Sequence, residues 1–312
     1  MVDLSVRIGD VLLENPVMPG SGTFAEGMAD AIDLDRLGAI VTKTITPDVR
    51  HGNPQPRVTE VVGGMLSSIG IPSKGPDHYL SELVPFYARF RPPLVASVSA
   101  GTAQQFAALA ARVGGPEIVA IEANISCPNL EANGRAFAMF PEDTENVIRA
   151  MKAATRVPVW AKLTPNIGDI TVIARAAEAA GADALVVANA LLGMAIDVHT
   201  FKPKLGNLMG GVTGQAMKPV ILRMVHQCWR AVKLPIIGCG GIANVEDAVE
   251  YMLAGATAIQ VGTASFIHPN TMIDIIDALP GFLASHGVAR LADLVGAVRV
   301  GDAVDPLWQM AG

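Results

Sequence analysis

Residues 157–190 read VPVWAKLTPNIGDITVIARAAEAAGADALVVANA, two apolar runs separated by a stretch with helical spacing. The runs at 157–164 and 184–190 are rich in Val and Ala and barely alternate with polar residues. This pattern is typical of strands that are buried on both faces of a parallel sheet. Residues 170–181 repeat their apolar positions with the helical period and end at Gly181, where a C-terminal glycine of a helix belongs. The stretch therefore predicts a strand–helix–strand unit.

The same alternation continues along the chain in both directions. Six further apolar runs of this kind are PVMPGS (16–21), AIVTKTIT (39–46), LVASVS (94–99), IVAIEANIS (118–126), PIIGCGG (235–241) and AIQVGTA (258–264). Helical spacing recurs at residues 103–113, 144–155, 218–232 and 245–256. Eight strand–helix units predict an α/β fold of the closed (β/α)8 TIM-barrel type, whereas six would suggest an open doubly wound sheet.

Three other stretches complete the predicted organisation. Residues 4–15 (LSVRIGDVLLEN) alternate around Gly9-Asp10, which predicts an N-terminal β-hairpin. The connection from Pro47 to Lys74 is dense in Gly, Pro and Ser, and a connection of this length is usually functional or disordered. Because no linker or internal repeat interrupts the chain, we expect residues 1–312 to form a single domain.

Composition and charge exclude several classes of protein. Of 312 residues, 51% are apolar and 17% are charged, so the chain can bury a large core and is not intrinsically disordered. The net charge is −6 without a basic run, which argues against partners such as nucleic acid or an anionic membrane. Three cysteines without CxxC spacing, and an N-terminus unlike a signal peptide, predict a cytoplasmic protein. The histidine spacings predict no metal site.

Polar residues follow the predicted strands and should meet at the carboxyl-terminal mouth of the barrel, where barrel enzymes carry their chemistry. Lys43, Lys162, Asn124, Cys127 and Asn189 stand at these strand ends. The last two strands end in glycine-rich turns, GCGGIAN (238–244) and GTA (262–264), whose backbone N–H groups can bind an anion. The sequence therefore predicts a phosphate-bearing ligand at this mouth, although glycine also simply permits tight turns.

Cys127 lies in NISCPN (124–129), directly after a buried strand. A cysteine in a hydrophobic core is usually inert. Here the polar neighbours Asn124, Ser126 and Asn129 would have to lie in the same core, which argues against that interpretation of Cys127. A thiol titrates near pH 8.5 and can act as a general base after modest tuning. Cys228 in a helix and Cys239 in a glycine turn are expected to serve packing.

Several motifs together resemble class 1 dihydroorotate dehydrogenases, over essentially the whole chain. They are NISCPN, TKTIT (42–46) with GNPQPR (52–57), WAKLTPN (160–166), GMLSSIGIPSKG (64–75), IIGCGGI (236–242) and AGATAIQVGTA (254–264). Within class 1 the chain is most similar to the catalytic subunit of the heteromeric, NAD-linked class 1B type. The resemblance implies an FMN-containing barrel that oxidises (S)-dihydroorotate to orotate in pyrimidine biosynthesis. It also implies a homodimer and a separate electron-transfer subunit with FAD and an iron–sulfur cluster.

The resemblance also assigns residues. Cys127 would be the catalytic base and Lys43 would contact both the flavin and the substrate. Residues matching the family's FMN contacts are Ser21, Lys43, Thr44, Ser97, Asn124, Lys162, Ala188, Gly214, Gly240, Gly241, Gly262 and Thr263. Residues matching its substrate contacts are Lys43, Ser67, Ile69, Gly70, Ile71, Asn124, Asn129, Asn189 and Ala190.

Two of the substrate-contact positions depart from the family pattern and keep other functions open. Ser67 stands where the family has Asn, and Ala190 stands where it has Thr. Losing a hydrogen bond to a charged ligand costs roughly 1.5–3 kcal/mol. The alternatives are an FMN enzyme acting on a different dihydropyrimidine or cyclic amide, a Schiff-base lyase or aldolase that uses Lys162, and a flavin-binding accessory protein without turnover.

Overall fold

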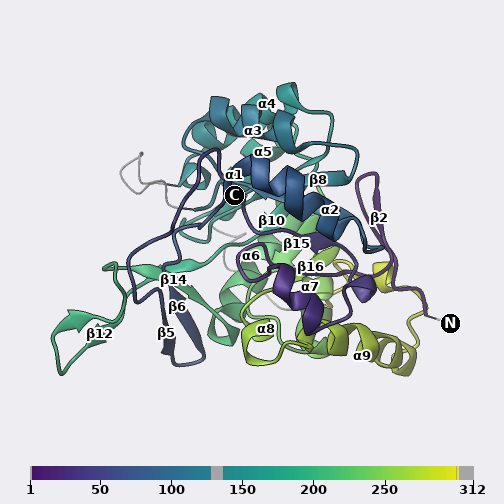
Figure 1. The fold of residues 1–312 in the computed structure, drawn as a ribbon. Helices are drawn as coiled ribbons and strands as arrows, with labels where there is room; N and C mark the ends of the chain where they lie inside the picture. Colours follow the sequence, from purple (N-terminus) through teal and green to yellow (C-terminus); the bar gives the residue numbers. More distant parts are fainter. Residues whose placement is uncertain (1, 128–135, 300, 302–312) are drawn as a thin grey trace.

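The computed structural model describes residues 2–127, 136–299 and 301, and its central feature is a sheet of eight parallel strands (Figure 1). The strands are β3 (Val17–Pro19), β4 (Ile40–Val41), β7 (Leu94–Val98), β8 (Ile118–Ala123), β9 (Val159–Lys162), β10 (Ala184–Val187), β15 (Ile236–Cys239) and β16 (Ala258–Val261). Their order in the sheet is their order in the chain, and β16 pairs with β3. The Gly38 N–H donates to the Val17 carbonyl at 2.8 Å where β3 and β4 meet. The predicted (β/α)8 barrel is confirmed.

Helices cover the outside of this sheet, with bounds close to those predicted. They are α3 (Ala103–Val113), α4 (Pro141–Ala154), α5 (Ile170–Ala179), α6 (Lys218–Ala231) and α7 (Val245–Ala254). Thr102, Asp169 and Asn244 cap the first turns of α3, α5 and α7, because each side chain accepts a backbone N–H. On α5 the fully buried residues Ile173, Ala174 and Ala177 recur at helical spacing, so this face packs on the barrel.

The first and second units differ from a simple strand–helix repeat. After β3 the chain forms two short 3-10 turns, η1 (Glu26–Asp30) and η2 (Leu34–Arg36), in place of a helix. After β4 it forms a composite helix of α1 (Gly75–His78), the π-helical η3 (Tyr79–Leu83) and α2 (Val84–Tyr87). The remaining helical segments are η4 (Phe137–Met139), η5 (Gln215–Met217), α8 (Ala264–Ile267), α9 (Thr271–Ser285) and η6 (Leu291–Leu294). Within the described ranges, no helix is both long enough and apolar enough to cross a membrane.

The N-terminal hairpin forms as the sequence predicts. Strands β1 (Val6–Ile8) and β2 (Val11–Leu13) pair antiparallel, and Gly9 at the turn has a φ of 59°. Ile8 and Leu13 are almost fully buried in the core. Because the hairpin leads directly into β3, it packs at the amino-terminal end of the barrel.

The connection between Pro47 and Lys74 is an ordered structure rather than an irregular loop. It contains β5 (Val58–Val61) and β6 (Gly64–Ser67), which join β14 (Gly210–Thr213) and β11 (Leu191–Gly193) in an antiparallel sheet of order β11-β14-β6-β5. A short hairpin of β12 (Ile196–Asp197) and β13 (Lys202–Pro203) extends from the same side (Figure 1). This second sheet contributes one wall of the site described next.

Candidate active site

A cavity of about 780 Å³ opens at the carboxyl-terminal ends of the barrel strands and is bounded on one side by the small antiparallel sheet. Its volume lies within the range of about 300–1,000 Å³ that is usual for small-molecule and cofactor sites. The site residues that the sequence predicts come together on its wall. They are Ser21, Lys43, Thr44, Ser67, Ile69, Gly70, Ile71, Asn124, Cys127, Lys162, Ala188, Asn189, Ala190, Gly214, Gly240, Gly241, Gly262 and Thr263.

One predicted residue, Ser97, is not part of this wall. Asn129 lies outside the described residues. Ser97 is fully buried beneath the cavity, where its hydroxyl contacts Thr44 Oγ1 at 2.9 Å and donates to Glu122 Oε1 at 3.0 Å. Ser97 therefore supports the wall from behind. Its side chain points into the barrel because it occupies an inward position of β7.

Cys127 is half-buried on the cavity wall, in an environment with two opposing electrostatic influences. Burial raises the pKa of the Cys127 thiol to about 11, although the positive charges of Arg50 and Lys43 work in the opposite direction. Burial also lowers the pKa of Lys43, and the nearby Cys127 partly opposes this shift. A thiol and an ammonium group thus influence each other's charge on the same wall of the cavity.

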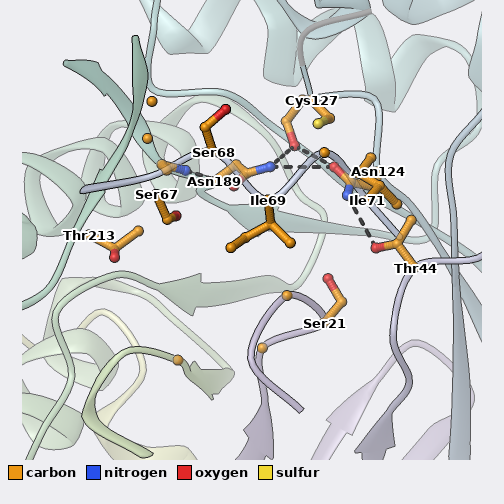
Figure 2. A pocket seen from close by; sticks show the side chains of 18 of the residues that line it. Ser21, Thr44, Ser67, Ser68, Ile69, Ile71, Asn124, Cys127, Asn189 and Thr213 are labelled. Atoms are coloured by element: carbon orange, nitrogen blue, oxygen red, sulfur yellow. Dashed lines mark hydrogen bonds between the residues drawn. The ribbon is translucent and has the colours of Figure 1, made fainter. Parts of the chain in front are cut away.

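Amide and hydroxyl side chains form a connected network beside Cys127. Asn189 Nδ2 donates to Ser126 Oγ at 2.9 Å, and Ser126 Oγ donates to Asn124 Oδ1 at 2.9 Å. Asn124 Nδ2 donates to Thr44 Oγ1 at 3.3 Å. Figure 2 shows these bonds running from Asn189 to Thr44, with Cys127 next to them. The network fixes two amides that offer both donors and acceptors to a polar ring.

Lys162 stands at the end of β9 and is 4% exposed, and sequence reasoning missed two of its partners. Its Nζ donates to Gln260 Oε1 at 2.9 Å and to Ser21 Oγ at 3.4 Å, and lies 3.6 Å from Glu122 Oε2. Burial is the largest single influence on the pKa of Lys162 and lowers it, but the charge of Glu122, the nearby Cys239 and a hydrogen bond to Glu122 together raise the pKa above its ordinary value. The available signal was a charged and a polar residue inside the apolar runs IVAIEANIS and AIQVGTA.

The glycine-rich turns after β15 and β16 form a cradle for an anion. Gly241 has a φ of 73°, and a Cβ there would lie 2.9 Å from both the Gly214 carbonyl oxygen and Lys218 Cβ, so only glycine fits. Among the described residues, the backbone N–H groups of Gly241 and Thr263 have no hydrogen-bond acceptor in the protein. Asp247 holds the Gly241 turn, because it accepts the Ala243 N–H at 2.9 Å. These free donors suit a phosphate group.

The small antiparallel sheet supplies the remaining wall through Ser67 to Ile71. Ser68 Oγ accepts from Asn53 Nδ2 at 2.8 Å and from Asn207 Nδ2 at 2.9 Å, which ties three loops together above the cavity. Arg50, Asn53 and Asn207 also line the cavity, and sequence reasoning did not select them. Cys239 packs against the hydrophobic core as expected and also lies on the cavity wall, because it ends β15 at the mouth.

The fold and the cavity define a barrel protein whose ligand site lies at the carboxyl-terminal ends of the strands. Residues 3–283 match the dihydroorotate dehydrogenase family model, and the chain belongs to this family.

Relatives of known name cover nearly the whole chain. A protein of Pelobacter propionicus is 46% identical over 300 residues, which is 95% of this chain and 99% of that protein. One from Desulforamulus reducens is 46% identical over 302 residues, covering 96% of this chain and 99% of the relative. One from Bacteroides thetaiotaomicron is 43% identical over 303 residues, covering 96% of this chain and all of the relative. All three are named dihydroorotate dehydrogenase B (NAD(+)), catalytic subunit.

Proposed function

We propose that this protein oxidises (S)-dihydroorotate to orotate in pyrimidine biosynthesis, with FMN bound in the cavity at the barrel mouth. The observation that carries the proposal is the arrangement of Cys127 and Lys43 beside an amide network, in the same cavity as the free N–H groups of Gly241 and Thr263. A cyclic ureide presents donors and acceptors in alternation, and the amides of Asn124 and Asn189 complement both. The names of the relatives support dihydroorotate over another ring.

FMN fits the residues that are present. Its phosphate would be held by the backbone around Gly240, Gly241, Gly262 and Thr263, where donors are free and a Cβ at Gly241 would collide. A Cβ added to Gly22 would meet no atom within 4 Å, so open space adjoins the turn after β3. The remaining contacts of the flavin would come from Ser21, Lys43, Thr44, Asn124, Lys162, Ala188 and Gly214. When bound, FMN supplies the acceptor for the hydride that leaves C6 of the substrate.

The protein's own groups manage the proton and the orientation of the substrate. The Cys127 thiolate takes the proton from C5, and the electron pair of that C–H bond forms the C5=C6 double bond as hydride leaves C6. Lys43 contributes positive charge beside Cys127 and the substrate, which favours the thiolate before transfer. Asn124 and Asn189 hold the ring, because their amides are already fixed by Ser126 and Thr44.

An anaerobic titration tests the proposal. The purified protein is expected to be yellow, and dihydroorotate should bleach the flavin absorbance in one-to-one stoichiometry with bound FMN. A protein that carries FMN and is not bleached would exclude dihydroorotate as substrate. A colourless protein in which sodium borohydride traps a substrate on Lys162 would instead support the lyase alternative.

The rate of flavin reduction is expected to rise with pH. Burial raises the pKa of Cys127 to about 11, so the thiol is mostly protonated at pH 7 and only the thiolate can accept the C5 proton. The thiolate fraction, and with it the rate, should increase about tenfold per pH unit between pH 7 and 9. Anaerobic stopped-flow measurements of flavin bleaching provide the profile. A rate independent of pH over this interval would contradict a base that is protonated in the resting protein.

The two departures from the family pattern lead to a prediction about affinity. Ser67→Asn together with Ala190→Thr is expected to tighten orotate binding by about 10-fold or more, because each change offers one more hydrogen bond to the ligand. The dissociation constant of orotate follows from the change in the flavin spectrum on titration. Each single variant serves as a control for the pair. Unchanged or weaker binding would show that the cavity wall around Ala190 and its neighbour Gly211 differs in shape from the family's orotate pocket.

The partner and domain assignments complete the proposal. The relatives are named as catalytic subunits of NAD(+)-linked enzymes, which supports a separate FAD and iron–sulfur subunit that passes electrons to NAD. We further propose a homodimer, a cytoplasmic location and one FMN-binding domain over residues 1–312.

A further inference from the structure

Three buried polar side chains meet inside the barrel, directly below the cavity. Glu122 on β8 is 0% exposed, Gln260 on β16 is 1% exposed, and Lys162 on β9 is 4% exposed. In the sheet order β16 and β8 are separated by β15, β10 and β9, so Glu122 and Gln260 approach each other across the barrel. A carboxylate this deeply buried requires partners, since burying an unpaired charge is very costly.

Gln260 connects the two charged groups, and its orientation is determined by them. Its Nε2 donates to Glu122 Oε2 at 2.7 Å, and its Oε1 accepts from Lys162 Nζ at 2.9 Å. A carboxylate can only accept and an ammonium group can only donate, so the Gln260 amide can satisfy both in one orientation only. Ser97 occupies the other oxygen of Glu122 at 3.0 Å. Every group in the cluster therefore has a defined partner.

The cluster leaves Lys162 both charged and fixed. Its ammonium is held by Gln260 and Ser21 and lies 3.6 Å from the Glu122 carboxylate, while the same side chain forms part of the cavity wall. Burial alone would disfavour the charged form. Glu122 supplies the compensating negative charge from inside the barrel, beneath the cavity. The side of Lys162 that lines the cavity is therefore left available to a ligand.

We propose that Glu122 and Gln260 are positioning residues that keep Lys162 protonated at the flavin site and so set the pH dependence of the equilibrium between oxidised and reduced flavin. The inference rests on the proposed function, because it assumes FMN in this cavity. A lysine that is charged in both oxidation states of the flavin takes up no proton when the flavin is reduced. A lysine that is neutral beside the oxidised flavin takes up one proton as the anionic, reduced flavin forms.

Glu122→Gln is the direct test, because the side chain keeps its shape and loses its charge. The equilibrium constant for two-electron reduction of bound FMN is measured against a reference dye between pH 6 and 9, without dihydroorotate. For each unit by which the pH rises, the constant is expected to fall in the variant by a further factor of about ten relative to the wild-type protein, because one extra proton accompanies reduction. A purely structural role would lower the melting temperature and leave this pH slope unchanged.

The matched control moves the carboxylate across the cluster. In the double variant Glu122→Gln/Gln260→Glu, the amide at 122 can accept from Ser97 and donate to the carboxylate at 260, and that carboxylate faces Lys162 Nζ directly. Every hydrogen bond of the cluster is kept and so is its net charge. The double variant is therefore expected to regain the wild-type pH slope.

The outcomes separate this inference from the proposed function. A Glu122→Gln protein with the wild-type slope overturns the inference, and so does a double variant that keeps the steeper slope. If Glu122→Gln does not fold, the wild-type protein provides the test. A break between pH 7 and 10 in the pH slope of its reduction equilibrium would show that Lys162 loses its proton, and would overturn the inference. A wild-type protein that binds no FMN overturns the proposed function and the inference together. FMN-loaded protein that dihydroorotate fails to bleach overturns only the proposed substrate.

Discussion

Cys127→Ser is expected to keep bound FMN and to slow reduction of the flavin by dihydroorotate by about 10²- to 10⁴-fold, the usual contribution of a general base. A serine hydroxyl is a much weaker acid than a thiol, so the thiolate that would take the C5 proton is lost. The positive charges of Lys43 and Arg50, which favour the thiolate of Cys127, do too little for an alkoxide. Anaerobic stopped-flow mixing with dihydroorotate measures the rate, and the flavin absorbance before mixing measures the FMN content.

The matched control is the same substitution at a thiol outside the cavity. Cys228 is fully buried on α6, so Cys228→Ser should lower the melting temperature and leave the rate of flavin reduction within about twofold of the wild-type rate. Equal rates in the Cys127→Ser variant and the wild-type protein would remove Cys127 from the mechanism. A large loss of rate in both variants would point to a general effect of destabilisation.

The barrel could be predicted from the sequence because its strands are buried on both faces. A run such as ALVVANA at 184–190 is apolar at nearly every position, and the structure places β10 within it. The cavity residues could be predicted for a related reason. Polar residues that end such runs, for example Lys43 and Lys162, must meet at one end of a parallel barrel.

The small antiparallel sheet was not predicted, because its pairing is not local. Strand β6 takes β14 as a neighbour, and Leu66 lies opposite Val212. The turn at Gly63-Gly64 between β-branched and apolar residues was a hairpin signal for β5 and β6. Nothing in that turn indicates a third strand about 140 residues later in the chain.

The Glu122 cluster was missed for a similar reason. Glu122 and Gln260 each appear as one polar residue within an apolar run, which on its own contradicts a fully buried strand. Only the closure of the barrel brings β8 and β16 to opposite walls, where the two side chains satisfy each other at 2.7 Å. Sequence reasoning that asked for the partner of each buried polar residue would have recognised the problem, although not its solution.

Gly241→Ala is expected to weaken FMN binding by at least about 10- to 150-fold, the range for one lost hydrogen bond to a charged group. The added Cβ would lie 2.9 Å from the Gly214 carbonyl oxygen and from Lys218 N, and the φ of 73° disfavours any residue with a side chain. The turn must therefore shift, and the Gly241 N–H moves away from the phosphate. Fluorescence titration of the apoprotein with FMN measures the dissociation constant.

Gly281→Ala provides the matched control, because Gly281 lies within α9 and a Cβ there would meet no atom within 4 Å. It should leave FMN affinity unchanged and stabilise the protein by about 0.5–1 kcal/mol, as alanine does in place of glycine inside a helix. Riboflavin, which lacks the phosphate, separates the two possible causes of a loss at position 241. If Gly241→Ala weakens the binding of FMN but not that of riboflavin, the turn binds the phosphate. If both are weakened equally, the substitution has distorted the cavity as a whole, and the phosphate site must be sought elsewhere on its wall.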